Sequence, residues 1–159
     1  MSRDLTTPRW VVLLWLLPAL LLSAIPLPEW LAALWPDWLL LLLIAFALHS
    51  PRSCGPVTAF GAGLVLDAFR GILLGQHAFA FVVVVWLVHR FRLRVRMFTP
   101  LHQAGVVLSL LWLYQFLLFW IDGVSGHPLT DWARWLPVVT GALCWNVLSA
   151  WLERHALRH

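Results

Sequence analysis

The stretch that decides the fold reads Gly61-Ala-Gly63-Leu-Val-Leu-Asp67-Ala-Phe-Arg70-Gly71-Ile-Leu-Leu-Gly75-Gln-His77. It places a carboxylate, Asp67, inside a run of apolar residues, and Arg70 follows one helical turn later. The glycines on both sides permit close approach of neighbouring backbones. An ionisable side chain in sequence apolar enough for a membrane is by default a candidate functional site.

The composition around this stretch is typical of an integral membrane protein. Of the 159 residues, 62% are hydrophobic and 11% are charged, and the mean hydropathy is +0.84. Soluble domains carry about 25% charged residues, so a soluble domain is excluded as the main component. A membrane-spanning helix needs about 20 apolar residues, which leaves room for five or six spans in a chain of this length.

Six apolar segments separated by polar turns predict an all-α, polytopic membrane protein. We expect one domain, a compact bundle of six transmembrane helices with short loops. The predicted spans are residues 10–27, 36–50, 57–69, 72–89, 101–121 and 135–152. The second and third are short for a bilayer, which indicates a thinned bilayer or a partly shielded position. The number of spans is five if the third segment is re-entrant.

The arginines predict the orientation. Six spans place nine of them on one side of the membrane, namely Arg3, Arg9, Arg52, Arg90, Arg92, Arg94, Arg96, Arg154 and Arg158. Arg70 and Arg134 fall on the other side, together with the acidic residues Glu29, Asp37, Asp122 and Asp131. By the positive-inside rule the arginine-rich side and both termini are cytoplasmic.

Asp67 has three interpretations. It forms an intrahelical pair with Arg70, both side chains reaching toward the outer surface. Alternatively, it accepts hydrogen bonds from a partner helix or fixes the turn between the third and fourth spans, with Arg70 balancing its charge. A proton or ion relay is the third interpretation, but it would need a second carboxylate inside the membrane.

The remaining candidates surround Asp67 or lie at the cytoplasmic side. Gly61, Gly63, Gly71 and Gly75 are either contact and turn positions within one subunit or a docking face for another. We interpret His77 as a hydrogen-bonding turn residue rather than a catalytic base. The cluster at the cytoplasmic side, Arg90, Arg92, Arg94 and Arg96, sets topology and binds anionic lipid headgroups, or docks a cytoplasmic protein partner. Nucleic acid is not an expected partner.

No catalytic set is visible. The chain has no nucleophile elbow, zincin pair, phosphate-cradling loop or paired carboxylates, so we expect no enzyme activity, no catalytic residue, no cofactor and no metal. Cys54 and Cys144 are not expected to form a disulfide. The apolar segments also offer little polar lining for a ligand pocket, and no small-molecule substrate is expected.

The order of these features resembles the MreD family, the rod shape-determining membrane proteins of bacteria. The resemblance rests on Trp38, on Ala59-Phe60-Gly61, Gly63-Leu64, Asp67, Gly71, Leu74-Gly75 and His77-Ala78, and on an arginine-rich turn that closes on Arg96-Met97-Phe98. It covers the whole chain in length and topology, and its specific part is residues 59–78.

This resemblance implies a non-enzymatic scaffold subunit of the cell-elongation complex, located in the bacterial inner (cytoplasmic) membrane and supporting peptidoglycan synthesis. The implied partners are an MreC-like single-span protein, the RodA glycosyltransferase, an elongation-specific transpeptidase and the actin-like MreB. The family is also similar in fold to the substrate-binding subunits of energy-coupling-factor vitamin transporters. A substrate-binding subunit of a vitamin-type transporter is therefore the alternative function.

Overall fold

A computed structural model describes residues 8–126 and 132–155, and the regular secondary structure in these ranges is entirely helical. The prediction of an all-α fold is therefore confirmed. Arg3, Asp131 and Arg158, whose sides of the membrane are predicted from the sequence, lie outside the described residues.

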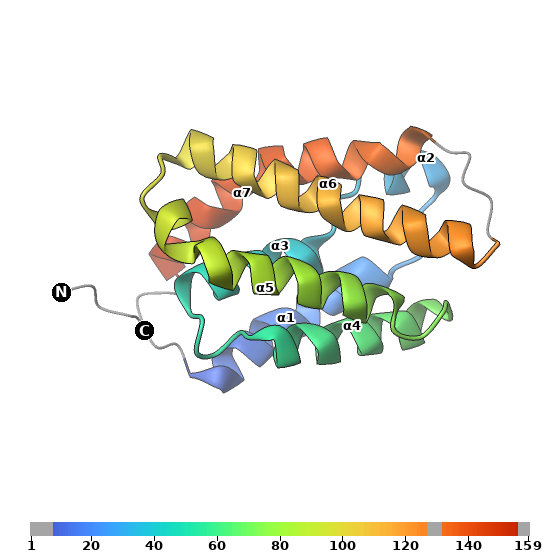
Figure 1. Cartoon of the computed structure of the whole chain (residues 1–159), viewed down its shortest axis with the longest axis horizontal. Helices are drawn as coiled ribbons and strands as arrows, with labels where there is room; N and C mark the ends of the chain where they lie inside the picture. Colours follow the sequence, from blue (N-terminus) through green and yellow to red (C-terminus); the bar gives the residue numbers. More distant parts are fainter. Residues whose placement is uncertain (1–7, 127–131, 156–159) are drawn as a thin grey trace.

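The described ranges contain six helices of 12 or more residues and two short ones. In chain order they are α1 (Arg9–Ala24), α2 (Glu29–Ala32), α3 (Trp38–His49), α4 (Pro56–Arg70), α5 (Gln76–Arg96), α6 (Pro100–Val124), the 3₁₀ helix η1 (Trp132–Trp135) and α7 (Leu136–His155). Figure 1 shows α4, α5, α6 and α7 running lengthwise, with α4 beside α5 and α6 beside α7. The α4–α5 turn, the end of α6 and the start of α7 lie at the same end of the bundle (Figure 1).

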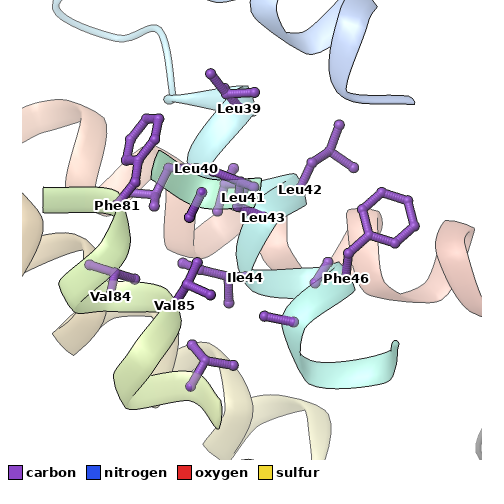
Figure 2. Packing of buried hydrophobic residues seen from close by; sticks show 14 of the residues in the cluster. Leu39, Leu40, Leu41, Leu42, Leu43, Ile44, Phe46, Phe81, Val84 and Val85 are labelled. Atoms are coloured by element: carbon purple, nitrogen blue, oxygen red, sulfur yellow. The ribbon is translucent and has the colours of Figure 1, made fainter. Parts of the chain in front are cut away.

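Helix α3 forms the centre of the bundle because it is apolar on every face. All ten residues from Leu39 to Leu48 are buried, as expected for a helix without a polar side. Figure 2 shows Phe81, Val84 and Val85 of α5 packed against it, and α1 and α7 contact it as well. A helix of 12 residues is only about 18 Å long. The second predicted segment therefore occupies a position covered by protein.

Helices α4 and α5 pack against each other backbone to backbone at Gly63. A Cβ atom added at this position would lie 2.3 Å from the Cα of Ala78 and 2.5 Å from its backbone nitrogen. A hydrogen atom is thus the largest side chain that fits. Gly61, half a turn away on α4, has no heavy atom within 4 Å of the same added Cβ.

Two predicted boundaries are wrong. The segment from Arg90 to Arg96, expected as a cytoplasmic turn, forms the last two turns of α5. Arginine is a good helix former, and cations near a helix C-terminus are stabilised by the helix dipole. The fourth apolar segment is expected to start at Ile72, but α5 starts at Gln76 because residues 71–75 form a turn.

Only one of the described helices, α6, is both long and apolar enough to cross a membrane by itself. Helices α1 and α3 are apolar but shorter. Each of the six predicted ranges overlaps one long helix, and the crossing of a membrane by these helices stays a prediction.

Replacing Gly63 by alanine should lower stability, because the methyl group would overlap the α5 backbone. We expect a loss of about 1–3 kcal/mol or more, the usual cost of overpacking. Gly61→Ala is the matched control and should be neutral or stabilising by up to about 1 kcal/mol, since alanine is the better helix former. Thermal unfolding of the purified variants in detergent measures both, and equal behaviour of the two variants would contradict the close approach.

Candidate functional site

Asp67 lies at the centre of a buried polar network at the end of α4. Its side chain is fully buried and accepts hydrogen bonds from the backbone N–H of Gly75 at 2.8 Å and of His77 at 3.1 Å. The His77 ring nitrogen Nδ1 donates a third at 2.7 Å. Several donors aimed at one carboxylate stabilise its charged form in a buried position.

The turn between α4 and α5 is shaped so that these donors point at Asp67. Gly71 has φ +62° and Gly75 has φ +99°, a left-handed backbone that other residues rarely adopt. Because Gly75 caps α5 without a side chain, Asp67 supplies the oxygen atoms that accept from the first N–H groups of this helix. The turn is thus held by a residue from the preceding helix.

Arg70 is linked to Asp67 through the His77 ring. The Nη1 atom of Arg70 lies 3.1 Å from His77 Nε2, and arginine can only donate. His77 therefore accepts at Nε2 while it donates at Nδ1, which defines a neutral ring with the proton on Nδ1. The Nε and Nη2 atoms of Arg70 donate to the carbonyl of Ser23 at 3.3 and 2.7 Å. One arginine thus joins the C-terminal ends of α1 and α4 to the start of α5.

A second carboxylate, Asp37, lies on the other side of Ser23. It caps α3 by accepting from the Leu40 N–H at 3.4 Å, and it accepts from the Ser23 hydroxyl at 3.4 Å. The Tyr114 hydroxyl of α6 donates to it at 2.7 Å. Asp37 therefore ties α1, α3 and α6 together.

Aromatic packing connects the two carboxylates. The ring of Tyr114 stacks on Phe81 with centroids 5.6 Å apart, and its centroid is 6.1 Å from that of His77. Rings at such distances contribute attraction beyond the area that they bury. The polar groups of Asp67 and Asp37 are thus parts of one packed region.

A third carboxylate, Asp122, completes the arrangement near the end of α6. It accepts from the Gln76 amide at 2.6 Å and forms an ion pair with Arg134 of η1. This ion pair is partly exposed, whereas Asp67 is not. Asp67, Asp37 and Asp122 therefore each connect two or more helices at one end of the bundle.

These groups surround a cavity of about 640 Å³. Its polar lining includes Asp37, Arg70, Gln76, His77, Tyr114, Gln115, Asp122 and Arg134. The expectation of little polar lining for a ligand pocket is therefore wrong. Arg70, Gln76 and His77 belong to the stretch around Asp67, whereas the other polar lining residues come from distant segments that no local motif connects.

The other predicted residues fall into two places. Gly61 lines a groove between α1 and α4, while Gly63 is buried in the α4–α5 contact. The arginines of the cluster lie in the last two turns of α5, at the opposite end of the bundle from Asp67 (Figure 1). The structure therefore brings Asp67, Arg70, Gly75 and His77 together and leaves the arginine cluster apart.

The two cysteines do not form a disulfide with each other, and Cys54 is buried. Cys54 and Cys144 are both free thiols. The Cys54 thiol points to the Leu43 carbonyl at 3.7 Å, and burial raises the pKa of this thiol to about 12. An uncharged, buried thiol is a poor nucleophile. Within residues 8–126 and 132–155, no group of three or more histidine, cysteine or acidic side chains is arranged to hold a metal ion.

The chain is similar in sequence to rod shape-determining proteins, both by a family profile and by a single relative. The profile of a family described as rod shape-determining protein MreD matches residues 5–154. The rod shape-determining protein MreD of Haemophilus influenzae is 24% identical over 127 residues, which cover 80% of this chain and 78% of that protein. No solved structure matches the chain significantly.

Replacing Asp67 by alanine should destabilise the fold strongly. The change leaves the buried donors of Gly75 and His77 without an acceptor, and loss of one partner from a buried charged network costs about 3–5 kcal/mol. Unfolding of the purified protein by heat or denaturant measures the loss.

Glu29→Ala serves as the control because Glu29 is exposed, and it should change stability by no more than about 0.5 kcal/mol. The double variant with His77→Ala should be less destabilised than the sum of the single changes, by about 0.5–3 kcal/mol. Strict additivity would show that the two residues do not interact.

Proposed function

The chain belongs to the MreD family of rod shape-determining membrane proteins, and we propose on this basis that it is a scaffold subunit of the cell-elongation complex. The family is non-enzymatic and acts in the determination of cell shape. In the proposed role the chain supports peptidoglycan synthesis by binding an MreC-like single-span protein. RodA, the elongation transpeptidase and MreB are the further proposed partners, in the bacterial inner membrane.

The outer surface of the bundle supports a position inside the membrane with six crossings. Large apolar side chains are exposed on the outward faces of five long helices, among them Leu17, Phe69, Trp86, Trp120 and Leu143. Soluble monomers rarely expose apolar surface so extensively. Lipid would cover these faces, with the end of the bundle that carries the arginine cluster and both termini at the cytoplasmic side.

The groove between α1 and α4 is the observation that carries the proposed binding of a partner. It has a volume of about 510 Å³ and is lined almost entirely by apolar groups, including Leu17, Val57, Gly61, Ala62 and Val65. Helices associate in membranes through small residues that let backbones approach closely. The open space at Gly61 gives such an approach to a helix from outside the bundle.

Asp67 supports this surface from within. It is fully buried, so a partner would not touch it while the network is intact. Its hydrogen bonds to Gly75 and His77 fix the end of α4, one of the two helices that line the groove, against α5. In the proposed function Asp67 and His77 position the docking face, and Gly61 contacts the partner.

The arginine cluster has a separate proposed role. Arg90 and Arg94 are exposed on α5, and Arg92 is half-buried. Together with Arg96 they would attract anionic lipid headgroups with about 1 kcal/mol per arginine. This contact would fix the depth of the bundle in the cytoplasmic leaflet.

The alternative function, a substrate-binding subunit of a vitamin-type transporter, is supported by the cavity at the Asp67 end. Its volume of about 640 Å³ lies within the range of about 300–1,000 Å³ that is usual for ligand pockets. Mass spectrometry of the purified protein and uptake assays on a deletion strain test this function. A vitamin-like ligand together with an uptake defect would favour the transporter over the scaffold.

Filling the groove should break the proposed complex. Gly61→Leu should reduce recovery of a tagged single-span partner at least tenfold and should produce round cells, because the leucine side chain occupies the space for the partner helix. Gly105→Leu is a matched control on α6, where an added Cβ also meets nothing within 4 Å. Equal recovery of the partner by both variants would remove the groove from the proposal.

The topology can be measured with single cysteines in a chain whose Cys54 and Cys144 are replaced by serine. Glu29→Cys should react with a membrane-impermeant maleimide added from the outer face. Arg52→Cys should react only after the inner membrane is opened, because the six-span arrangement places it in the cytoplasm. Both positions are exposed in the structure, so labelling reports the side of the membrane. Labelling of both from the outer face would contradict the arrangement.

A further inference from the structure

The cavity at the Asp67 end of the bundle, which we call the outer cavity, holds charges of both signs. Arg70 and Arg134 contribute two guanidinium groups to its lining, and Asp37 and Asp122 contribute two carboxylates. The formal charges of the lining therefore cancel. A ligand that carries one charge of a single sign would meet repulsion from half of these groups, whereas a zwitterion would meet partners for both of its ends.

The charged groups retain capacity for further hydrogen bonds. Arg70 is exposed and uses three of its five N–H groups for Ser23 and His77. Asp122 accepts one bond on each oxygen, and a carboxylate has about four acceptor positions. Both can therefore bind a ligand without giving up the contacts that hold the helices.

The rim of the outer cavity is apolar. Ile25, Ile72 and Leu73 line it and are 51%, 40% and 55% exposed. A small water-soluble ligand gains little from such a rim. A lipid would place its headgroup among the charges and its first acyl carbons against these side chains, where they stay out of water.

We propose that the outer cavity binds the headgroup of a zwitterionic phospholipid of the phosphoethanolamine class. The phosphodiester accepts hydrogen bonds from Arg70 and Arg134. The ammonium group donates to Asp122 and Asp37, and the acyl chains leave over the apolar rim. This site goes beyond the scaffold function, because its lining residues differ from those of the groove at Gly61.

Binding is tested with the purified full chain in micelles of a non-ionic maltoside detergent, which carries no charge that could occupy the outer cavity. Fluorescently labelled phosphatidylethanolamine and phosphatidylglycerol are titrated separately, and free phosphoethanolamine is added as a competitor. The proposal expects phosphatidylethanolamine to bind at least tenfold more tightly than phosphatidylglycerol. It also expects free phosphoethanolamine to compete at least tenfold more weakly than the lipid, because it lacks the acyl carbons.

Charge variants identify the site. Arg134→Gln should weaken binding of both lipids about tenfold or more, since it removes a donor to the phosphate. Asp122→Asn should weaken phosphatidylethanolamine by a similar factor but improve phosphatidylglycerol, because the lining becomes net positive. If Arg134→Gln or Asp122→Asn does not fold, Gln115→Ala replaces them, because it removes an amide of the cavity lining without changing the charge. This variant should weaken the binding of phosphatidylethanolamine at least threefold. Arg90→Gln, on α5 at the other end of the bundle, should change neither affinity.

Several results would overturn the proposal. Equal affinity for the two lipids, or affinity unchanged by the folded cavity variants, would show that the lipids bind elsewhere. Free phosphoethanolamine that competes as well as the lipid would assign the cavity to a soluble zwitterion. Recovery of the single-span partner, measured in the same variants, reports separately on the scaffold function.

Discussion

The carboxylate of Asp67 has no contact with solvent, and the surrounding structure must supply the hydrogen-bond donors that water would otherwise provide. Removing a charge from water costs several kcal/mol unless close donors replace the water. Here the donors are two backbone N–H groups and one imidazole N–H, and the positive charge of Arg70 is joined through the same imidazole. The donors point at Asp67 only because the chain reverses between α4 and α5. Gly71 and Gly75 make this reversal with a left-handed backbone.

This arrangement relates the two surfaces to which we assign binding. Arg70 also donates two hydrogen bonds to the Ser23 carbonyl of α1 and so connects α1 with α4. The groove at Gly61 lies between these two helices, and Arg70 lines the outer cavity. A headgroup bound at Arg70 would therefore contact a residue that joins the two helices of the groove.

Much of the fold follows from the amino-acid sequence, because long apolar runs predict helices and polar turns separate them. The short, uniformly apolar segment 36–50 also indicates a position covered by protein, and α3 lies there. The ends of α5 are less predictable. At its start, Gly71 and Gly75 turn the chain before α5 begins. At its end, the arginine cluster continues α5, because the helix propensity of arginine and the helix dipole favour helix over a turn there.

The candidate site is predictable only in its local part. Asp67 and His77 are ten residues apart and meet across one turn. Ser23, Asp37 and Tyr114 approach the same region from distant segments. Asp37 and Tyr114 are 77 positions apart in the sequence, so only tertiary packing brings them together. The most direct measurement of the central claim is the ¹⁵N chemical shifts of the His77 ring by solid-state NMR in lipid bilayers. We predict a neutral ring with the proton on Nδ1, and a changed Nδ1 shift in the Asp67→Ala variant, where this N–H loses its acceptor. A proton on Nε2 in the unmodified chain would contradict the network.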